Sequence, residues 1–457
     1  MRCAFAQVRF VPKTVDARLV TRALCQLGHV RTLDRLGTRG PLDASAGRAS
    51  AFGCLFGRDS VRMALDLLDD FPAVAHATIT RLTALQGVTH NARAEEEPGR
   101  ILHEHRCTDD PLTRRIQQRW DLPYYGTVDA TPLYAILISA YCERYGPSLL
   151  RERVRDRNGH LISVRSGLAR ALAWIEARLE RDGFVCVRRA QPDGIQNQIW
   201  EDSGDSQYDE TGRLFDPAIP YAPVAVQGYA YDALRVGARW VDDRRQALRW
   251  RALARVLRRK VLASFWLPEM GTFAPAVVLD APSPRPARVV ASSPGHLLAG
   301  GLLDGPDATG YRERLVQRLL APDLLAAAGI RTKSVTAPRF HPGAYHNGSV
   351  WPMDTGVIAD GLRRHGYVVQ ADDLEERILR ACASVGRLVE FFRGDLDSRI
   401  LINECSVDVV DDAAVWTVEQ PPQHIQGWTV TRVWNILRRR GILDRTGDLL
   451  EAEPRAA

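Results

Sequence analysis

Apolar residues recur at three- and four-residue spacing along most of the chain, with polar residues at the positions between them. This spacing places the apolar side chains on one face of an α-helix, and it is sustained too long in each segment for a strand. The pattern predicts helices over residues 61–71, 74–86, 132–145, 166–181, 224–240, 244–263, 310–320, 356–364, 372–390 and 428–437.

Strand patterns are sparse, and residues 183–189 are the best candidate. The gaps between the helices carry Pro and Gly with polar and aromatic residues, as loops do. No long linker or shift in composition marks a second domain. We therefore expect an all-α fold, an (α/α)6 toroid of about a dozen paired helices whose loops gather at one end to form the site. We expect the toroid to span residues 51–445, with an extension over 1–50 packed on it and a tail over 446–457.

The composition is that of an ordinary globular protein, with 457 residues, 45% of them hydrophobic and 25% charged. No segment reaches the roughly 18 to 20 apolar residues that a membrane span needs. The first residues, Met1 to Phe5, lack the apolar stretch of a signal peptide. These features predict a cytoplasmic protein that does not bind membranes.

The net charge of +6 comes almost entirely from arginine, because the only lysines are Lys13, Lys260 and Lys333. Acidic residues are interleaved throughout and no recognition module is present, so we do not expect nucleic-acid binding. The cysteines have no Cys-x-x-Cys spacing, which disfavours a zinc cluster or a dithiol site and favours free thiols. They are Cys3, Cys25, Cys54, Cys107, Cys142, Cys186, Cys382 and Cys405.

The segment over residues 200–206 is the strongest candidate for chemistry. It places Glu201, Asp202 and Asp205 directly after Trp200 and beside small residues. A carboxyl group near an apolar face can keep its proton at neutral pH, and an indole can stack on a sugar ring. The alternative is a solvated turn with a partly buried tryptophan.

Several other segments place polar and aromatic residues where helices begin or end. At residues 56–60, Asp59 or Ser60 can cap a helix, and Arg58 with Asp59 can grip sugar hydroxyls. The His103-x-His105 pair is weak support for a metal site, and we expect neither a metal nor a cofactor. The further candidates for sugar contacts are Trp120, Tyr125, Asp129, Trp200, Glu201, His346, Asn347, Trp351, Gln423 and Trp428.

An ordered set of motifs resembles the amylo-α-1,6-glucosidase family, the glucosidase part of glycogen debranching enzymes. The motifs include Phe-Gly-Arg-Asp-Ser at 56–60, Trp-Glu-Asp-Ser at 200–203, Ser-Pro-Gly-His-Leu-Leu at 293–298 and Tyr-His-Asn-Gly-Ser-Val-Trp-Pro at 345–352. The resemblance runs from about residue 50 to residue 437. It implies a six-hairpin (α/α) toroid and an inverting glycosidase.

The resemblance also assigns roles to individual residues. It implies that Asp202 is the proton donor, with Asp205 in reserve. It implies that Glu390 is the base, although Val389 and Arg393 replace the family's Pro and Cys; Glu404 and Glu419 remain possible. It likens Arg58 and Asp59 to the pair that binds the terminal sugar's hydroxyls in glucoamylase-like pockets.

Together these observations predict an inverting hydrolase that releases glucose from the non-reducing end of an α-glucan, an oligosaccharide or polysaccharide. The leading expectation is amylo-α-1,6-glucosidase activity. The alternatives are the same fold acting on trehalose-like, mannosyl or short heteroglycoside substrates, and a carbohydrate-binding toroid without activity. The chain has only about 50 residues before the toroid, where bacterial relatives commonly carry a β-rich domain.

Overall fold

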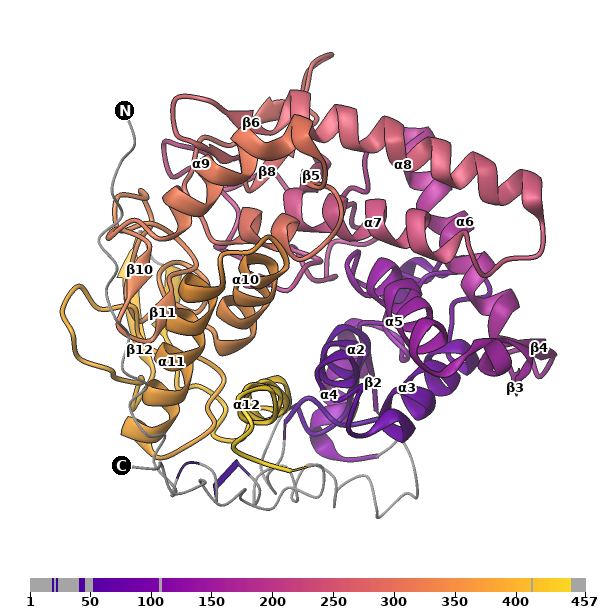
Figure 1. The fold of residues 1–457 in the computed structure, drawn as a ribbon, viewed down its shortest axis with the longest axis horizontal. Helices are drawn as coiled ribbons and strands as arrows, with labels where there is room; N and C mark the ends of the chain where they lie inside the picture. The colour runs from indigo at the N-terminus through magenta and orange to yellow at the C-terminus, as the bar shows by residue number, and fades with distance from the viewer. Residues whose placement is uncertain are drawn as a thin grey trace, which may run out of the picture.

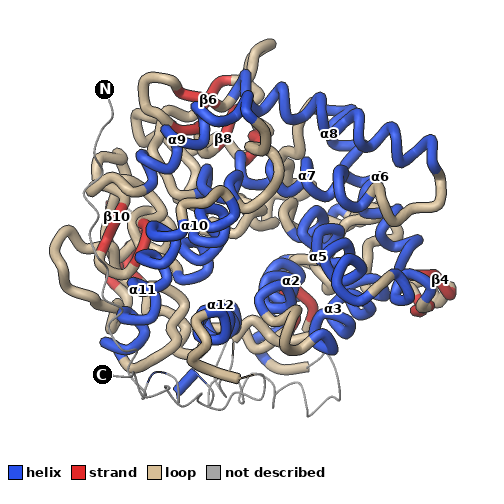
Figure 2. The backbone as a smooth tube through the Cα atoms, in the orientation of Figure 1, coloured by secondary structure: helices blue, strands red, loops and turns tan. Residues whose placement is uncertain are grey.

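The computed structural model describes residues 41–45, 52–106, 109–411 and 414–444, together with Leu19, Arg22 and Ala23. Helices are the main regular secondary structure of this part of the chain, and the strands are few and short (Figure 2). They are α2 (Gly57–Asp66), α3 (Pro72–Ala84), α4 (Pro111–Arg119), α5 (Ala130–Tyr145), α6 (Val164–Asp182), α7 (Val224–Gly237), α8 (Arg244–Ser264), α9 (Thr309–Leu319), α10 (Pro352–Arg364), α11 (Val368–Val385) and α12 (Gly427–Arg439). The short 3-10 helices are η1 (Ala92–Ala94), η2 (Pro147–Arg151), η3 (Ser293–Leu298) and η4 (Pro306–Ala308).

The helices form two concentric layers (Figure 1). In the inner layer α2, α5, α7, η3, α10 and α12 each contact the next, and α12 contacts α2 to close the ring. The elements that follow them along the chain, α3, α6, α8, α9 and α11, pack on the outside. This arrangement is an (α/α)6 toroid, so the predicted fold class is confirmed.

The burial pattern of each helix matches its layer. Inner helix α5 has neighbours on several sides, and Leu133, Tyr134, Leu137 and Ile138 along it are all buried. Outer helix α8 buries only one stripe, at Ala247, Trp250, Ala254, Leu257 and Val261, and its opposite face is exposed. A single apolar stripe is enough for a helix that packs against one layer.

The ten helices that the apolar spacing predicts are all present, but several bounds are wrong. Helices α2, α10 and α11 begin four residues earlier than predicted, and the segment predicted over 61–71 ends at Asp66. The segment predicted over 372–390 ends at Val385, because Gly386 adopts the left-handed conformation (φ 66°) that closes a helix. Glu390 therefore lies beyond the helix rather than at its end. Helix α4 was not predicted, because Leu112 and Ile116 are its only large apolar residues.

The strands are short and all their pairings are antiparallel. The strand predicted over 183–189 is wrong, since Val187 forms only an isolated bridge with Tyr221. The pairs are β1 (Leu55–Phe56) with β2 (Glu104–His105), β3 (Arg153–Arg155) with β4 (Leu161–Ser163), β6 (Trp266–Leu267) with β7 (Thr272–Phe273), β10 (Leu325–Ala326) with β11 (Gly329–Ile330) and β12 (Val407–Asp411) with β13 (Ala414–Glu419). The remaining sheet has the order β5 (Tyr221–Pro223), β8 (Ala276–Val278), β9 (Arg285–Pro286).

Three inner helices begin at residues that line one cavity. Asp59 is in the first turn of α2, Trp351 precedes α10 and Gln426 precedes α12. Asp129, which precedes α5, lies 3.5 Å from the cavity residue Arg58. Neither Asp59 nor Ser60 is the N-cap of α2, since that position is Phe56. The loops that precede the inner helices thus bring distant segments of the chain together at one end of the toroid.

Most of the predicted extension over 1–50 and the tail over 446–457 lie outside the described residues, as do Cys3, Cys25 and Cys107. Within 41–45, the Ala44 carbonyl accepts a hydrogen bond from the backbone N–H of Gly427, and Ser45 bridges Gln426. The domain bounds stay a prediction. None of the helices in the described ranges combines the length and apolar character needed to cross a bilayer.

Candidate active site

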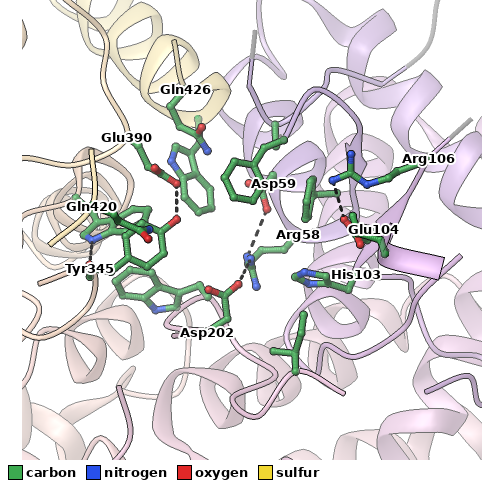
Figure 3. Close-up of a pocket in the computed structure, with 18 of the residues that line it drawn as sticks. Arg58, Asp59, His103, Glu104, Arg106, Asp202, Tyr345, Glu390, Gln420 and Gln426 are labelled. Carbon is green, nitrogen blue, oxygen red and sulfur yellow. Dashed lines mark hydrogen bonds and ion pairs between the residues drawn. The ribbon is translucent and has the colours of Figure 1, made fainter. Parts of the chain in front are cut away.

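A cavity of about 360 Å³ opens at the end of the toroid where these inner helices begin. Its lining comes from segments that lie far apart in the sequence (Figure 3). Around the candidate catalytic residues it is lined by Arg58, Asp59, Trp200, Asp202, Tyr345, Trp351, Glu390, Gln420, Gln426 and Trp428.

Asp202 lies in the loop that follows Trp200, and its side chain is 28% exposed. This exposed part faces the cavity. Burial raises the pKa of Asp202 to about 7, although the nearby Arg58 guanidinium lowers it. The charges of Asp59 and Asp129 raise it further. Asp202 can therefore hold a proton near neutral pH, as a general acid must.

Glu390 lies in an extended segment between the segments that contain Val350 and Gln423. Phe392 bridges Val350, and the Glu390 N–H donates to the Gln423 carbonyl. Tyr345 Oη donates to Glu390 Oε1 at 2.7 Å, and the Gln423 N–H donates to Oε2 at 3.1 Å. Burial raises the pKa of Glu390 to about 7, while these two hydrogen bonds lower it by stabilising the carboxylate.

Arg58 connects the acidic groups of the pocket. Its Nε, Nη1 and Nη2 lie 3.5 Å from carboxylate oxygens of Asp59, Asp129 and Asp202, respectively. Burial raises the pKa of Asp59 to about 6 despite this cation. Among the described residues, Arg58 Nε and Nη1 and Asp59 Oδ2 have no hydrogen-bond partner. Buried polar groups of this kind are suited to a polar ligand.

A cluster of aromatic rings around Trp351 forms part of the cavity lining. Trp351 packs against Trp200, Tyr345 and Trp428, with ring centroids 5.7, 5.0 and 5.8 Å apart. Phe391 stacks on Trp351 at 5.3 Å. The sequence predicted sugar contacts for Trp120, Trp200, Trp351 and Trp428, and all four line the cavity.

Several predicted site residues are placed away from the cavity lining. Tyr125 is buried in the core and its hydroxyl donates to the Leu85 carbonyl at 2.6 Å. Asn347 Nδ2 donates to Asp205 Oδ2 at 2.9 Å, so the reserve acid and the predicted contact residue engage each other.

His346, Gln423 and Asp129 act on the pocket through other groups. His346 stacks on Trp351 at 5.0 Å and contacts Ser203 Oγ through Nδ1 at 3.0 Å. Gln423 reaches Glu390 through its backbone, and Asp129 reaches the pocket through Arg58. The contacts thus position pocket residues.

The two reserve bases do not line the cavity either. Glu404 is exposed. Glu419 accepts a hydrogen bond from Arg393 Nη1 at 2.6 Å and lies 3.6 Å from His341 Nε2. Among the three candidate bases, Glu390 is the one that faces the pocket.

Sequence reasoning missed other lining residues. Tyr345 begins the 345–352 motif, and Gln420 and Gln426 flank the predicted Gln423, so their positions within motifs were the available signal. Glu104 and Arg106 also line the cavity and form an ion pair at 3.2 Å. Within the described ranges, no cluster of three or more His, Cys, Asp and Glu side chains could hold a metal ion.

Glu201, predicted to bind substrate, forms a buried ion pair instead. Lys333 Nζ lies 2.6 Å from Glu201 Oε1, and both side chains are 2% exposed. Burial raises the pKa of Glu201, and the Lys333 charge opposes this shift. The pair joins the loop over 200–206 to the segment that precedes the 345–352 motif.

Replacing Lys333 with Met is expected to lower the free energy of unfolding by roughly 3 to 5 kcal/mol, because Glu201 keeps its burial and loses its partner. Urea unfolding followed by circular dichroism measures the change. Lys260→Met, on an exposed position of α8, is the matched control and is expected to change stability by less than about 0.5 kcal/mol. Equal effects of the two substitutions would contradict the structural role of the pair.

Solved structures with the same fold come from Thermus thermophilus. A GH63 mannosylglycerate hydrolase in complex with Tris and D-glycerate is 15% identical, with a TM-score of 0.61, covering 92% of this chain and 100% of the other. The same enzyme in complex with glucose is 16% identical, with a TM-score of 0.59, covering 91% and 99%. An uncharacterized conserved protein is 15% identical, with a TM-score of 0.59 and the same coverage as the glucose complex. Identities this low establish the fold alone.

No curated protein sequence matches the chain. A family model does match, over residues 129–397, which is more than half of the 457 residues. The matched range includes both Asp202 and Glu390. The model describes a mannosylglycerate hydrolase MGH1-like glycoside hydrolase domain rather than a debranching enzyme, and the chain belongs to this glycoside hydrolase family.

Proposed function

We propose that this protein is an inverting hydrolase of a small α-hexoside, with Asp202 as general acid and Glu390 as general base. The observation that carries the proposal is that these two carboxyl groups face one cavity from different sides (Figure 3). Glu390 lies with Tyr345 and Gln420, whereas Asp202 lies beside Arg58. An inverting enzyme separates its two carboxyl groups by roughly 6.5 to 9.5 Å, which leaves room for the attacking water.

In this mechanism Asp202 gives its proton to the glycosidic oxygen as the bond to the anomeric carbon breaks. A water adds to that carbon from the opposite face and passes a proton to Glu390. The products are a hexose of inverted configuration and a free alcohol.

The active form of the pair carries one proton, and the titration belongs to the pair as a whole. The two hydrogen bonds that Glu390 accepts favour its charged form. The charges of Asp59 and Asp129 favour the protonated form of Asp202 against the opposing charge of Arg58.

The terminal hexose is held by Arg58 and Asp59, whose buried polar atoms suit adjacent hydroxyl groups. The aromatic rings of Trp200 and Trp351 supply the apolar surface for the sugar ring. The family and the glucose complex of the Thermus enzyme support mannose or glucose as the sugar.

The other functions predicted from the sequence receive less support. Amylo-α-1,6-glucosidase activity rests on the motif resemblance, and the family match supports the alternative of another glycoside instead. A toroid that only binds carbohydrate has no need for two carboxyl groups with raised pKa values in one cavity.

Replacing Tyr345 with Phe is expected to shift the acidic limb of the pH profile of kcat/KM to higher pH. The hydrogen bond from the Tyr345 hydroxyl lowers the pKa of Glu390. Its removal raises that pKa, so Glu390 becomes the deprotonated base only at higher pH. Initial rates across a pH series measure the shift. An acidic limb that stays in place in the variant would contradict the assignment of Glu390.

The proposal is tested by incubating the purified protein with α-mannosyl and α-glucosyl fluorides and following fluoride release. These substrates report cleavage at the anomeric carbon without any organic leaving group. Release from at least one of them, lost in Glu390→Gln, is expected. No release from either hexosyl fluoride would overturn the proposal.

A further inference from the structure

The cavity continues past Asp202 and Arg58 to a second wall, whose residues have no role in the proposed binding or hydrolysis of the terminal hexose. We call it the α4 wall, and it is lined by Phe52, Phe56, Leu112, Ile116, Trp120 and Ile195. The last residue of this set, Ile195, is linked to Trp120 through Tyr124, which stacks on Trp120 at 4.5 Å and accepts the Ile195 N–H at 2.8 Å.

The α4 wall lies on the side of the cavity formed by His103, Glu104 and Arg106. Phe56 packs against His103 with ring centroids 5.2 Å apart, and Trp120 Nε1 donates to Glu104 Oε1 at 3.3 Å. Figure 3 shows this side across the cavity from Glu390, with Arg58 between them. The wall therefore faces the base from the far side of the sugar site.

Inversion determines which part of the substrate meets this wall. The water that Glu390 activates attacks the anomeric carbon from the side of Glu390, and the bond that breaks points away from it. The leaving alcohol, the aglycone, therefore departs toward the α4 wall. The chemistry of the wall selects the aglycone.

Helix α4 presents a narrow apolar face to the cavity. Leu112 and Ile116 are four residues apart, so they share one face of the helix, and both are half-buried. Between them Thr113 is buried, whereas Arg114 and Arg115 are exposed, as is the next residue, Gln117. The only two large apolar side chains of this helix thus line the cavity.

The charged groups near the wall do not favour an anionic aglycone. Arg106 pairs with Glu104 at 3.2 Å, and Arg58 is shared among three carboxyl groups. Burial keeps the pKa of His103 well below its usual value, so its ring is neutral. Arg119 lies over the Trp120 ring with its guanidinium 4.9 Å from the ring centroid, at an exposed position of α4. A carboxylate entering the cavity would meet Glu104 and Asp202, and the arginines beside them, Arg106 and Arg58, already pair with these carboxylates.

We propose that the aglycone is a neutral alcohol with an apolar alkyl or aryl body that packs on the α4 wall. The inference rests on the proposed function and extends it to the substrate class. It sets this protein apart from the Thermus enzyme solved with D-glycerate, whose ligand is a carboxylate.

The test compares kcat/KM for methyl, butyl and hexyl α-glycosides of whichever hexosyl fluoride the protein cleaves, with the glyceric acid glycoside beside them. Burial of each added methylene is expected to raise kcat/KM up to about 4-fold until the wall is filled. Ile116→Asn is expected to flatten this dependence on chain length. The control is Gln117→Asn, which introduces asparagine on the exposed face of α4. This variant is expected to keep the dependence of kcat/KM on chain length.

The outcomes separate the two proposals. The unchanged protein could cleave a hexosyl fluoride while its kcat/KM stayed constant or fell as the alkyl chain lengthened. This result would overturn the apolar aglycone and leave the hydrolase assignment intact. A glyceric acid glycoside cleaved faster than the hexyl glycoside would also overturn it. No fluoride release would remove the hydrolase assignment and the aglycone with it.

Discussion

Replacing Asp202 with Asn is expected to reduce kcat/KM on an alkyl α-hexoside by roughly 10² to 10⁴, the usual worth of general acid catalysis. An alcohol is a poor leaving group unless its oxygen is protonated as the bond breaks. The amide of asparagine keeps the size of the side chain but has no acidic proton to give. Release of hexose, followed with a coupled assay, measures the loss.

A second substrate and a second variant show whether the activity lost in Asp202→Asn is due to the missing proton donor. A dinitrophenyl α-hexoside, whose leaving group needs no proton, is expected to lose far less activity in the same variant. Asp205→Asn is the matched control, since Asp205 is held by Asn347 and does not line the cavity. Losses as large in Asp205→Asn as in Asp202→Asn would contradict the choice of acid.

Replacing Glu390 with Gln is expected to reduce turnover by a similar factor, roughly 10² to 10⁴, on alkyl and dinitrophenyl substrates alike. The amide of glutamine cannot take a proton from water, whatever the leaving group. Loss on both substrates therefore separates the base from the acid. Adding azide, a nucleophile that needs no base, is expected to restore turnover and yield a hexosyl azide.

The control for the base is Glu419→Gln. The Glu419 side chain is paired with Arg393 and is absent from the cavity lining, so its replacement is expected to change turnover only a few-fold. If Glu419→Gln abolished activity and Glu390→Gln did not, the base would be Glu419.

The helices of this fold were predictable because each buries an apolar stripe that is visible in the sequence. The bounds of α5 and α8 fall within two residues of those predicted. Helix α4 was missed because Leu112 and Ile116 make too short a stripe, and both line the cavity instead of joining the hydrophobic core. Local spacing in the sequence does not show which apolar residues line a cavity.

The residue pattern singled out the segment that holds Asp202, whereas the choice of Asp202 and Glu390 as acid and base came from motif resemblance. The surroundings of these carboxyl groups were not predicted. Glu201 and Asp202 are adjacent in the sequence, yet Glu201 pairs with Lys333 and Asp202 faces the cavity. The distinction depends on a residue 132 positions away. Likewise, the Tyr345 hydrogen bond to Glu390 joins segments that only the closed ring of helices brings together.

Proton NMR of the first-formed hexose shows whether Asp202 and Glu390 invert the configuration of the anomeric carbon. The protein is mixed with an α-hexoside that it cleaves, and the anomeric signals are recorded before mutarotation. We expect the β-hexose to appear first and its signal to be lost in Glu390→Gln. An α-hexose as the first product would contradict inversion, because retention requires a different role for the second carboxyl group.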